Sequence, residues 1–91
     1  MKRYKATKAE WIILNEQLIE RDGYKCKMCD INYNLERHHI LKTQHGGGDV
    51  LENLIFLCNN CHVWVHNNIK KSQELGYLKS GLQEYYKNNE W

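Results

Sequence analysis

The stretch NLIFLCNNCHVWVH, residues 53–66, joins an apolar run to a CxxC pair and then to a helical pattern. The run 54–57 is uninterrupted and apolar, which is typical of a fully buried strand. Beyond Cys61, apolar residues and histidines recur at positions i, i+3, i+4 and i+7: His62, Val65, His66 and Ile69. The stretch therefore predicts a short strand followed at once by a helix, with cysteines at the junction.

The four cysteines form two pairs of identical spacing, Cys26-Lys-Met-Cys29 and Cys58-Asn-Asn-Cys61. The basic N-terminus has no apolar stretch behind it, so we expect no secretory signal and a reducing compartment, where disulfides are disfavoured. Paired CxxC turns in that setting predict a four-cysteine structural Zn²⁺ site. Two disulfides or a redox CxxC are the alternatives, but a redox motif lacks a βαβ context and leaves the second pair unexplained.

The length of 91 residues predicts one domain, 1–91. We expect a core at about 24–70, a basic arm and helix over 1–22, and a helical tail over 72–91. A chain this short buries a thin core, so a structural zinc would contribute much of its stability. No apolar run approaches the ~18 residues of a membrane span, and we expect a cytoplasmic protein.

Charge is informative locally and not globally, because the formal net charge is only +2. Positive residues concentrate in the first eight positions, and such an arm suits a phosphate backbone. A solvated tail that keeps the chain soluble is an equally good interpretation of this charge alone. The basic residues of the arm are Lys2, Arg3, Lys5 and Lys8.

Secondary structure can be assigned to several further segments. The capping-box pattern Thr7-Lys-Ala-Glu10 predicts a helix that ends at Asp22-Gly23. Its apolar stripe of Trp11, Leu14 and Leu18, with Ile12 and Ile19 beside it, indicates a core-covering element without chemistry. Residues 35–41 predict a first strand. Between the strands, Gly46, Gly47 and Gly48 indicate a flexible or closely approached backbone, without a Walker pattern, and residues 49–52 predict one helical turn.

The histidines give the second strong signal. His62 and His66 are four residues apart, so on a helix both imidazoles project from one face, as two ligands of one metal do. His38 and His39 are adjacent on the first predicted strand, where consecutive side chains point to opposite sides. At most one of that pair joins the same metal, which leaves the other for a different task.

A zinc finger with two cysteines and two histidines is the main rival for these ligands. It is disfavoured because 32 residues separate Cys29 from His62, against about 12–15 in such fingers, and the second cysteine pair would be left over. We interpret His45, in the glycine loop, as an ordinary surface histidine.

These motifs together resemble an HNH endonuclease of the zinc-bearing kind. The resemblance runs from about Cys26 to His66 and is carried by Arg37-His38-His39-Ile40, Gly46-Gly47-Gly48-Asp49, the run from Asn53 to His62, and His66. The small size resembles the free-standing HNH proteins of phages and mobile elements. One departure is the absence of a proline after the histidine pair, where this chain has Leu41-Lys42-Thr43.

The resemblance implies an α+β protein with a ββα-metal fold that hydrolyses DNA phosphodiester bonds. By position, His39 matches the general base and Asn53 the middle motif residue, which braces the loop and orients the base. His38, His62 and His66 match the ligands of one catalytic divalent cation (Mg²⁺, Mn²⁺, Ni²⁺, Co²⁺ or Zn²⁺), and the four cysteines match the structural zinc. We expect DNA contacts from Lys2, Arg3, Lys5, Arg37 and Lys42, with Gln44 as a further candidate.

Two other classes of function remain open at this stage. A zinc-stabilised module that binds DNA without cutting it explains the cysteines and the basic arm, but it does not need His38, His39 or His66. A zinc-knuckle module that recruits protein predicts no salt-sensitive DNA affinity, whereas phosphate binding weakens steeply with salt. One active site per chain would nick one strand, and a double-strand break would need a homodimer or two events. Other phage or packaging proteins are possible partners.

Overall fold

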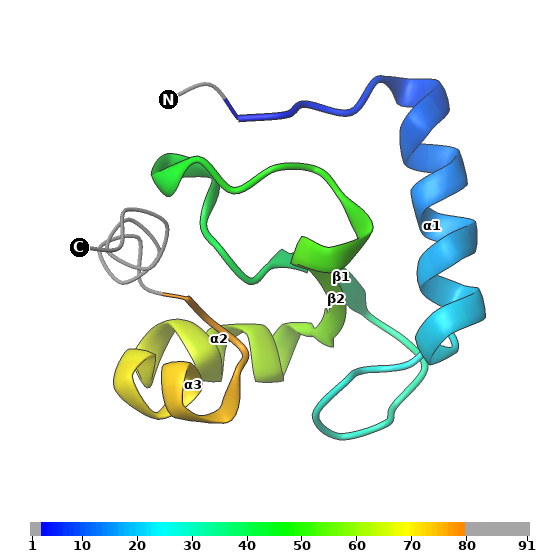
Figure 1. Ribbon diagram of the computed structural model, residues 1–91. Coiled ribbons are helices and arrows are strands. Elements are labelled where there is room, and N and C mark those ends of the chain that lie inside the picture. Colours follow the sequence, from blue (N-terminus) through cyan, green and yellow to red (C-terminus); the bar gives the residue numbers. More distant parts are fainter. Residues whose placement is uncertain (1–2, 80–91) are drawn as a thin grey trace.

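The computed structural model describes residues 3–79, and Figure 1 shows their arrangement. Lys2 and residues 80–91 of the expected helical tail lie outside the described residues. In chain order the elements are α1 (Lys8–Asp22), β1 (Leu35–His39), the 3-10 turn η1 (Thr43–His45), the 3-10 turn η2 (Leu51–Asn53), β2 (Leu54–Cys58), α2 (Asn59–Asn67) and α3 (Ile69–Leu75).

The centre of the fold is an antiparallel pair, β1 and β2, with Leu35 opposite Cys58 and His39 opposite Leu54. All five residues of β2 are buried, as its apolar run predicts. The first strand is two residues shorter than the expected 35–41. It ends at His39 because the backbone N–H of Leu41 donates to the side-chain oxygen of Asn53, at 2.7 Å, instead of to a strand.

Helix α1 covers one side of the sheet. Both hydrogen bonds of the predicted capping box are present, and the helix ends at Asp22 with Gly23 as its C-cap. The buried Leu18 packs with Leu54 and Phe56 of β2. Ile12 and Ile19, which we expected beside the apolar stripe, are exposed instead because they fall on the solvent side of the helix.

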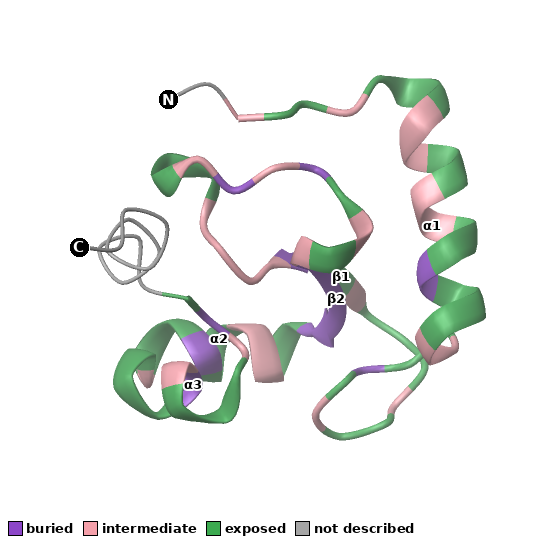
Figure 2. Cartoon of the chain, viewed as in Figure 1, coloured by how far each residue is buried: buried purple, intermediate pink, exposed green. Residues whose placement is uncertain are grey.

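Helix α2 covers the other side and α3 packs against α2, and Figure 2 colours the buried positions of these elements purple. Helix α3 ends at Gly76, whose φ of +89° is a left-handed cap that suits glycine. The chain then returns toward the start of the loop that follows β1. There Leu78 is buried and the N–H of Lys79 donates to the carbonyl of Ile40, at 2.9 Å.

The expected fold class is confirmed: this is a small α+β structure in which β1, β2 and α2 form a ββα unit with helices on both sides. In Figure 1 the N-terminal segment crosses above the loop between the strands before it enters α1. Among the described residues, no helix has the length and apolar character that crossing a bilayer requires.

Candidate active site and metal-binding clusters

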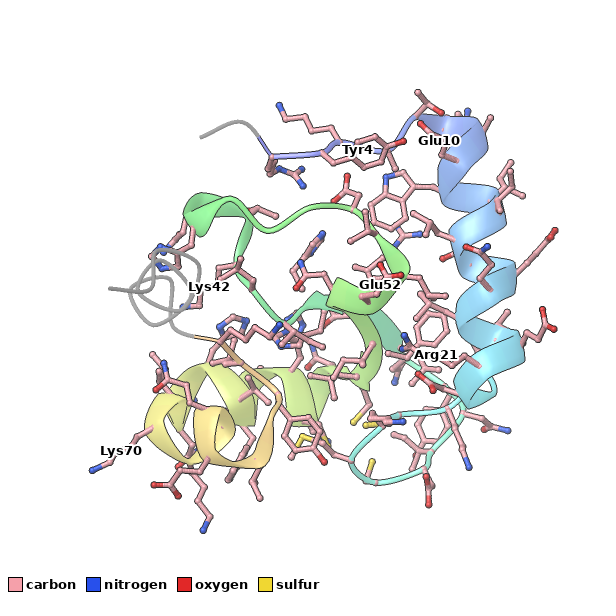
Figure 3. The ribbon with its side chains drawn as sticks, viewed as in Figure 1. Tyr4, Glu10, Arg21, Lys42, Glu52 and Lys70 are labelled. Atoms are coloured by element: carbon pink, nitrogen blue, oxygen red, sulfur yellow. The ribbon has the colours of Figure 1, made fainter. Side chains whose placement is uncertain are left out.

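The first cluster of metal-binding side chains contains all four cysteines, whose sulfur atoms lie within 4.8 Å of one another. Cys26 and Cys29 come from the loop after α1, Cys58 ends β2, and Cys61 lies in the first turn of α2. The Sγ atoms of Cys29 and Cys58 are 3.6 Å apart. A tetrahedral site with Zn–S bonds of ~2.3 Å requires roughly 3.8 Å between sulfurs, so the four positions fit zinc. The sulfur atoms gather beside the start of α2 in Figure 3.

The electrostatics of the four thiols also fit a cation. Burial raises the pKa of Cys26, but backbone hydrogen bonds outweigh this effect and bring that pKa to about 6. Burial and the neighbouring sulfurs raise the pKa of Cys61 well above its usual range. One thiol of this cluster therefore ionises readily, and its negative charge disfavours ionisation of the other thiols. A bound divalent cation is the group that allows all four thiols to ionise together.

The second cluster consists of His38, His62 and His66, and one ring nitrogen from each lies within 4.8 Å of the others. The ring centroids of His38 are 5.1 Å from His62 and 6.0 Å from His66. His38 is buried, while His62 and His66 reach the surface on one face of α2. Burial lowers the pKa of His38 to about 4, against the opposing effect of its hydrogen bond to Tyr77. It is therefore neutral at neutral pH, which is the form that binds metals.

Two acceptors determine which nitrogens of this cluster remain for a metal. Nε2 of His38 lies 2.6 Å from the carbonyl oxygen of Tyr77, and Nδ1 of His62 lies 2.6 Å from Oε1 of Glu36. A carbonyl and an ionised carboxylate only accept, so both ring nitrogens must carry hydrogen. Nδ1 of His38 and Nε2 of His62 are then the free lone pairs. Such outer contacts orient metal-binding histidines in many proteins.

His39 is not part of this cluster, because alternation along β1 places its side chain on the opposite side of the strand from that of His38. Its Nε2 lies 2.8 Å from Oδ1 of Asp49, and its ring meets the indole of Trp11 edge-on at 6.3 Å between centroids. Helix α1, for which we expected no chemical role, therefore packs against the His39 ring through Trp11. Of the two adjacent histidines, His38 therefore belongs to the three-histidine cluster and His39 does not.

The side chain of Asn53 holds the loop between the strands by hydrogen bonds. Its Oδ1 accepts from the N–H of Leu41, and its Nδ2 donates to the carbonyls of Leu41 and Gly48 at 3.1 Å. Gly47 is required by close approach, because a Cβ there would lie 1.8 Å from the Leu41 carbonyl oxygen. Among the described residues, the side chain that hydrogen-bonds with the His39 ring is Asp49, and not Asn53, which was expected to orient it. The expected turn at 49–52 is present as η2, but the Asp49 side chain does not cap it.

A surface hollow of about 400 Å³ contains both His39 and the three-histidine cluster. Arg37 lines this hollow and is held by α1, since its guanidinium lies 4.2 Å from the Trp11 ring centroid and donates to Asn15 at 3.1 Å. Lys42 also lines this hollow. Burial lowers the pKa of His66, and the nearby His62 and Lys42 lower it further. The remaining lining residues are Thr43 and Gln44. His45 is exposed and outside this hollow.

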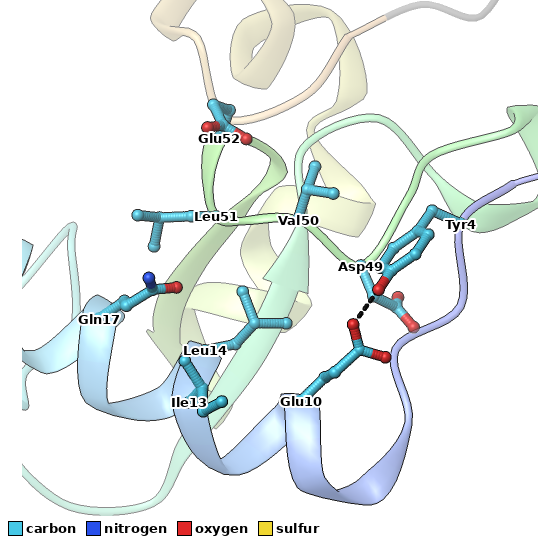
Figure 4. A pocket seen from close by; sticks show the side chains of 9 residues that line it. All are labelled: Tyr4, Glu10, Ile13, Leu14, Gln17, Asp49, Val50, Leu51 and Glu52. Carbon is cyan, nitrogen blue, oxygen red and sulfur yellow. Dashed lines mark hydrogen bonds between the residues drawn. The ribbon is translucent and has the colours of Figure 1, made fainter.

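The basic arm is only partly free to meet a phosphate. Arg3 donates to Oδ1 of Asp49 at 2.7 Å and to the Gly47 carbonyl at 3.3 Å, so its charge is already paired, while Lys5 is exposed. Figure 4 shows Asp49 between the arm and a second hollow of about 430 Å³ beside α1. The charged residues lining that hollow are all acidic, Glu10, Asp49 and Glu52, which disfavours a phosphate ligand there.

Three participants in the site escaped the sequence analysis: Asp49, Glu36 and the carbonyl of Tyr77. Glu36 had a usable signal, since it lies two residues before His38 and therefore on the same face of β1. Asp49 was visible only as part of the glycine-rich run. The approach of Tyr77 is a long-range backbone contact that local patterns do not encode.

Comparison with known proteins finds a family match over part of the chain. The family model described as HNH endonuclease matches residues 26–68. The resemblance to HNH endonucleases expected from the motifs is therefore confirmed over residues 26–68.

Two curated relatives are similar to the chain. Over 51 residues it is 39% identical to the type IV methyl-directed restriction enzyme EcoKMcrA of Escherichia coli (strain K12), which is 54% of this chain and 18% of that enzyme. Over 52 residues it is 29% identical to anaredoxin of Nostoc sp. (strain PCC 7120), which is 56% of this chain and 68% of that protein. No solved structure matches the chain significantly.

Proposed function

We propose that this protein is a metal-dependent endonuclease that hydrolyses phosphodiester bonds of DNA. The proposal rests on the arrangement of four histidines around one hollow, three in a cluster and one apart. Three imidazoles face one another with free nitrogens, and His39 lines the same hollow with a carboxylate behind it. The family match and the similarity to a restriction enzyme support nuclease action on DNA.

The proposed roles follow from the chemistry of hydrolysis. His39 accepts a proton from the attacking water, a contribution of about 10²–10⁴ in rate. Lys42 and Arg37 supply positive charge that binds the phosphate backbone at the hollow. Asn53 holds the loop from which Lys42 projects. When bound by His38, His62 and His66, a divalent cation supplies Lewis-acid stabilisation of the negative charge that develops on the phosphate and the leaving oxygen.

The two clusters would hold different ions. The four thiols suit a structural Zn²⁺ that is fully enclosed by protein ligands. Three imidazoles favour Zn²⁺, Ni²⁺, Co²⁺ or Mn²⁺ over Mg²⁺, and they leave positions for phosphate and water. We propose that residues 1–91 act as one domain and that the protein works inside a cell. Each active site then cuts one strand of DNA.

The test is nicking of supercoiled plasmid by the purified protein with each of Mg²⁺, Mn²⁺, Ni²⁺, Co²⁺ and Zn²⁺. We expect nicked circles from the wild type and none from His39→Ala. The matched control is His45→Ala, which removes an exposed histidine of the loop that follows β1 and should cut at the wild-type rate.

The opposite outcome is equally specific. If the wild type shifts DNA in a salt-sensitive manner but cuts with none of these metals, the protein is a zinc-stabilised binding module and the proposal is wrong. Equal cutting by wild type and His39→Ala would remove His39 as the base.

A further inference from the structure

The N-terminal segment Arg3–Ala6 reaches the proposed general base through a single carboxylate. Asp49 is only 3% exposed and has four partners, three in the N-terminal segment and one in β1. His39 Nε2 and the Arg3 guanidinium meet its Oδ1 at 2.8 and 2.7 Å, and the N–H of Ala6 donates to its Oδ2 at 2.9 Å. Its own N–H donates to the carbonyl of Tyr4 at 2.8 Å. The segment therefore holds Asp49 at both its backbone and its side chain.

The ionisation of Asp49 follows from these partners. Burial alone would raise its pKa, but the hydrogen bonds from Arg3, His39 and the Ala6 N–H outweigh burial and hold that pKa below its usual range. Asp49 is therefore a carboxylate at neutral pH, and a carboxylate only accepts hydrogen bonds. Its contact with His39 requires that Nε2 carries the hydrogen.

We propose that Asp49 is a positioning residue for His39 and that Arg3 and the backbone of Ala6 fix Asp49 for this task. With hydrogen on Nε2, the lone pair of His39 is on Nδ1, and the structure assigns Nδ1 as the atom that accepts the proton from water. The Trp11 indole packs edge-on against the His39 ring. This inference rests on the proposed function and adds that the basic arm belongs to the active site through Arg3.

The same contacts explain why an amide cannot replace the carboxylate. Both oxygens of Asp49 face donors, Oδ1 facing His39 and Arg3 and Oδ2 facing the Ala6 N–H. An asparagine has one acceptor oxygen, so it must turn its NH₂ toward one set of donors. Either His39 loses its acceptor and its tautomer is released, or the N-terminal segment is released from the loop.

The first experiment compares Asp49→Asn with Glu52→Gln, which removes one negative charge from an exposed position of the same loop. We expect kcat at saturating plasmid to fall about 100-fold in Asp49→Asn, the scale of a misplaced reacting group, with little change in KM. Glu52→Gln should keep the wild-type kcat. Zinc content and thermal melting of each variant report on the fold.

The second experiment separates positioning from charge within the arm. Arg3→Ala and Lys5→Ala each remove one positive charge, so both should raise KM at low salt. Only Arg3→Ala should also lower kcat, by about ten-fold, and Arg3→Lys should recover most of it because an ammonium can still pair with Asp49. Equal effects of Arg3→Ala and Lys5→Ala, confined to KM, would overturn the role of Arg3. This comparison decides the matter for the arm even if Asp49→Asn fails to fold.

A third readout does not depend on cleavage. The ¹⁵N shifts of the His39 ring distinguish the two tautomers, and we expect hydrogen on Nε2 in the wild type and a mixture in Asp49→Asn. Hydrogen on Nδ1 in the wild type, or an unchanged tautomer with unchanged kcat in Asp49→Asn, would overturn the inference. Absence of nicking in the wild type with the expected tautomer would instead refute the proposed function alone.

Discussion

The sulfur cluster and the imidazole cluster share helix α2, yet they are built in opposite ways. Cys26 and Cys58 are buried parts of the apolar core, and the four sulfurs face one another. In the histidine cluster only His38 is buried, and the cluster opens into a hollow lined by basic and polar side chains. Enclosure by four soft ligands suits a structural ion, whereas an open position suits chemistry. The comparison teaches that the number of ligands and their surroundings, and not proximity alone, separate the two kinds of site.

The largest expected effect tests the structural side of this comparison. Cys58→Ser should release zinc and unfold the domain at ordinary temperature, because structural zinc in small domains contributes roughly 10–16 kcal/mol of apparent folding free energy. Circular dichroism melting and zinc content measure the effect. His66→Ala, which removes a ligand from the other cluster, should melt close to the wild type. Retained zinc and an unaltered melt in Cys58→Ser would contradict the structural role.

The next-largest effect tests the hollow that contains the histidines. His39→Ala should lower the rate of plasmid nicking by about 10²–10⁴, since it removes the proton acceptor. Zinc content, melting temperature and DNA affinity in gel shifts should stay near the wild-type values, because the ring of His39 lies outside the sulfur cluster and the apolar core. Loss of affinity in parallel with activity would indicate a binding role instead.

A smaller effect sharpens the description of the imidazole cluster. Glu36→Gln should weaken binding of the second metal by about 10–100-fold, because the carboxylate that orients His62 is lost. Titration calorimetry with Mn²⁺ or Co²⁺ on the zinc-loaded protein measures this change. Glu20→Gln, an exposed acid of α1, is the matched control and should bind as the wild type does. Identical affinities in all three proteins would remove Glu36 from the site.

The smallest effect concerns the loop between the strands. Gly47→Ala places a Cβ against the Leu41 backbone and should cost about 1–3 kcal/mol of stability. Gly48→Ala is the matched neighbour, since its Cβ would meet the Tyr4 Cβ at 3.3 Å, where the arm can yield slightly. We expect denaturant midpoints to fall clearly for Gly47→Ala and little for Gly48→Ala, with zinc retained in both. Similar midpoints would mean that the loop adapts.

Local patterns were sufficient for much of the fold. The capping box at Thr7 and Glu10 sets the start of α1, and the apolar run 54–57 gives β2 within one residue. The two CxxC spacings and the i, i+4 histidines bring the ligand candidates together because strand and helix geometry fix where such side chains point. These features depend on residues close in sequence or on repeated spacing.

What sequence reasoning missed depends on distant segments. The pairing of Arg3 with Asp49 joins residues 46 positions apart, and the Tyr77 carbonyl reaches His38 across 39. The end of β1 at His39 is set by the side chain of Asn53, which competes for the backbone of Leu41. Ile12 and Ile19 are exposed because helical phase, and not apolar character, decides which residues of α1 face the sheet.

The order of ligands along α2 has a consequence for what this domain can tolerate. Cys61 and His62 are neighbours at the start of one nine-residue helix, so the sulfur cluster sets the rotational phase of both imidazoles. One inserted residue between them would turn His62 and His66 about 100° around the helix axis while leaving every cysteine in place. Such a chain would still hold its structural ion but would aim its imidazoles at solvent. The spacing at residues 61 and 62 therefore fixes how the imidazoles are oriented relative to the sulfur cluster.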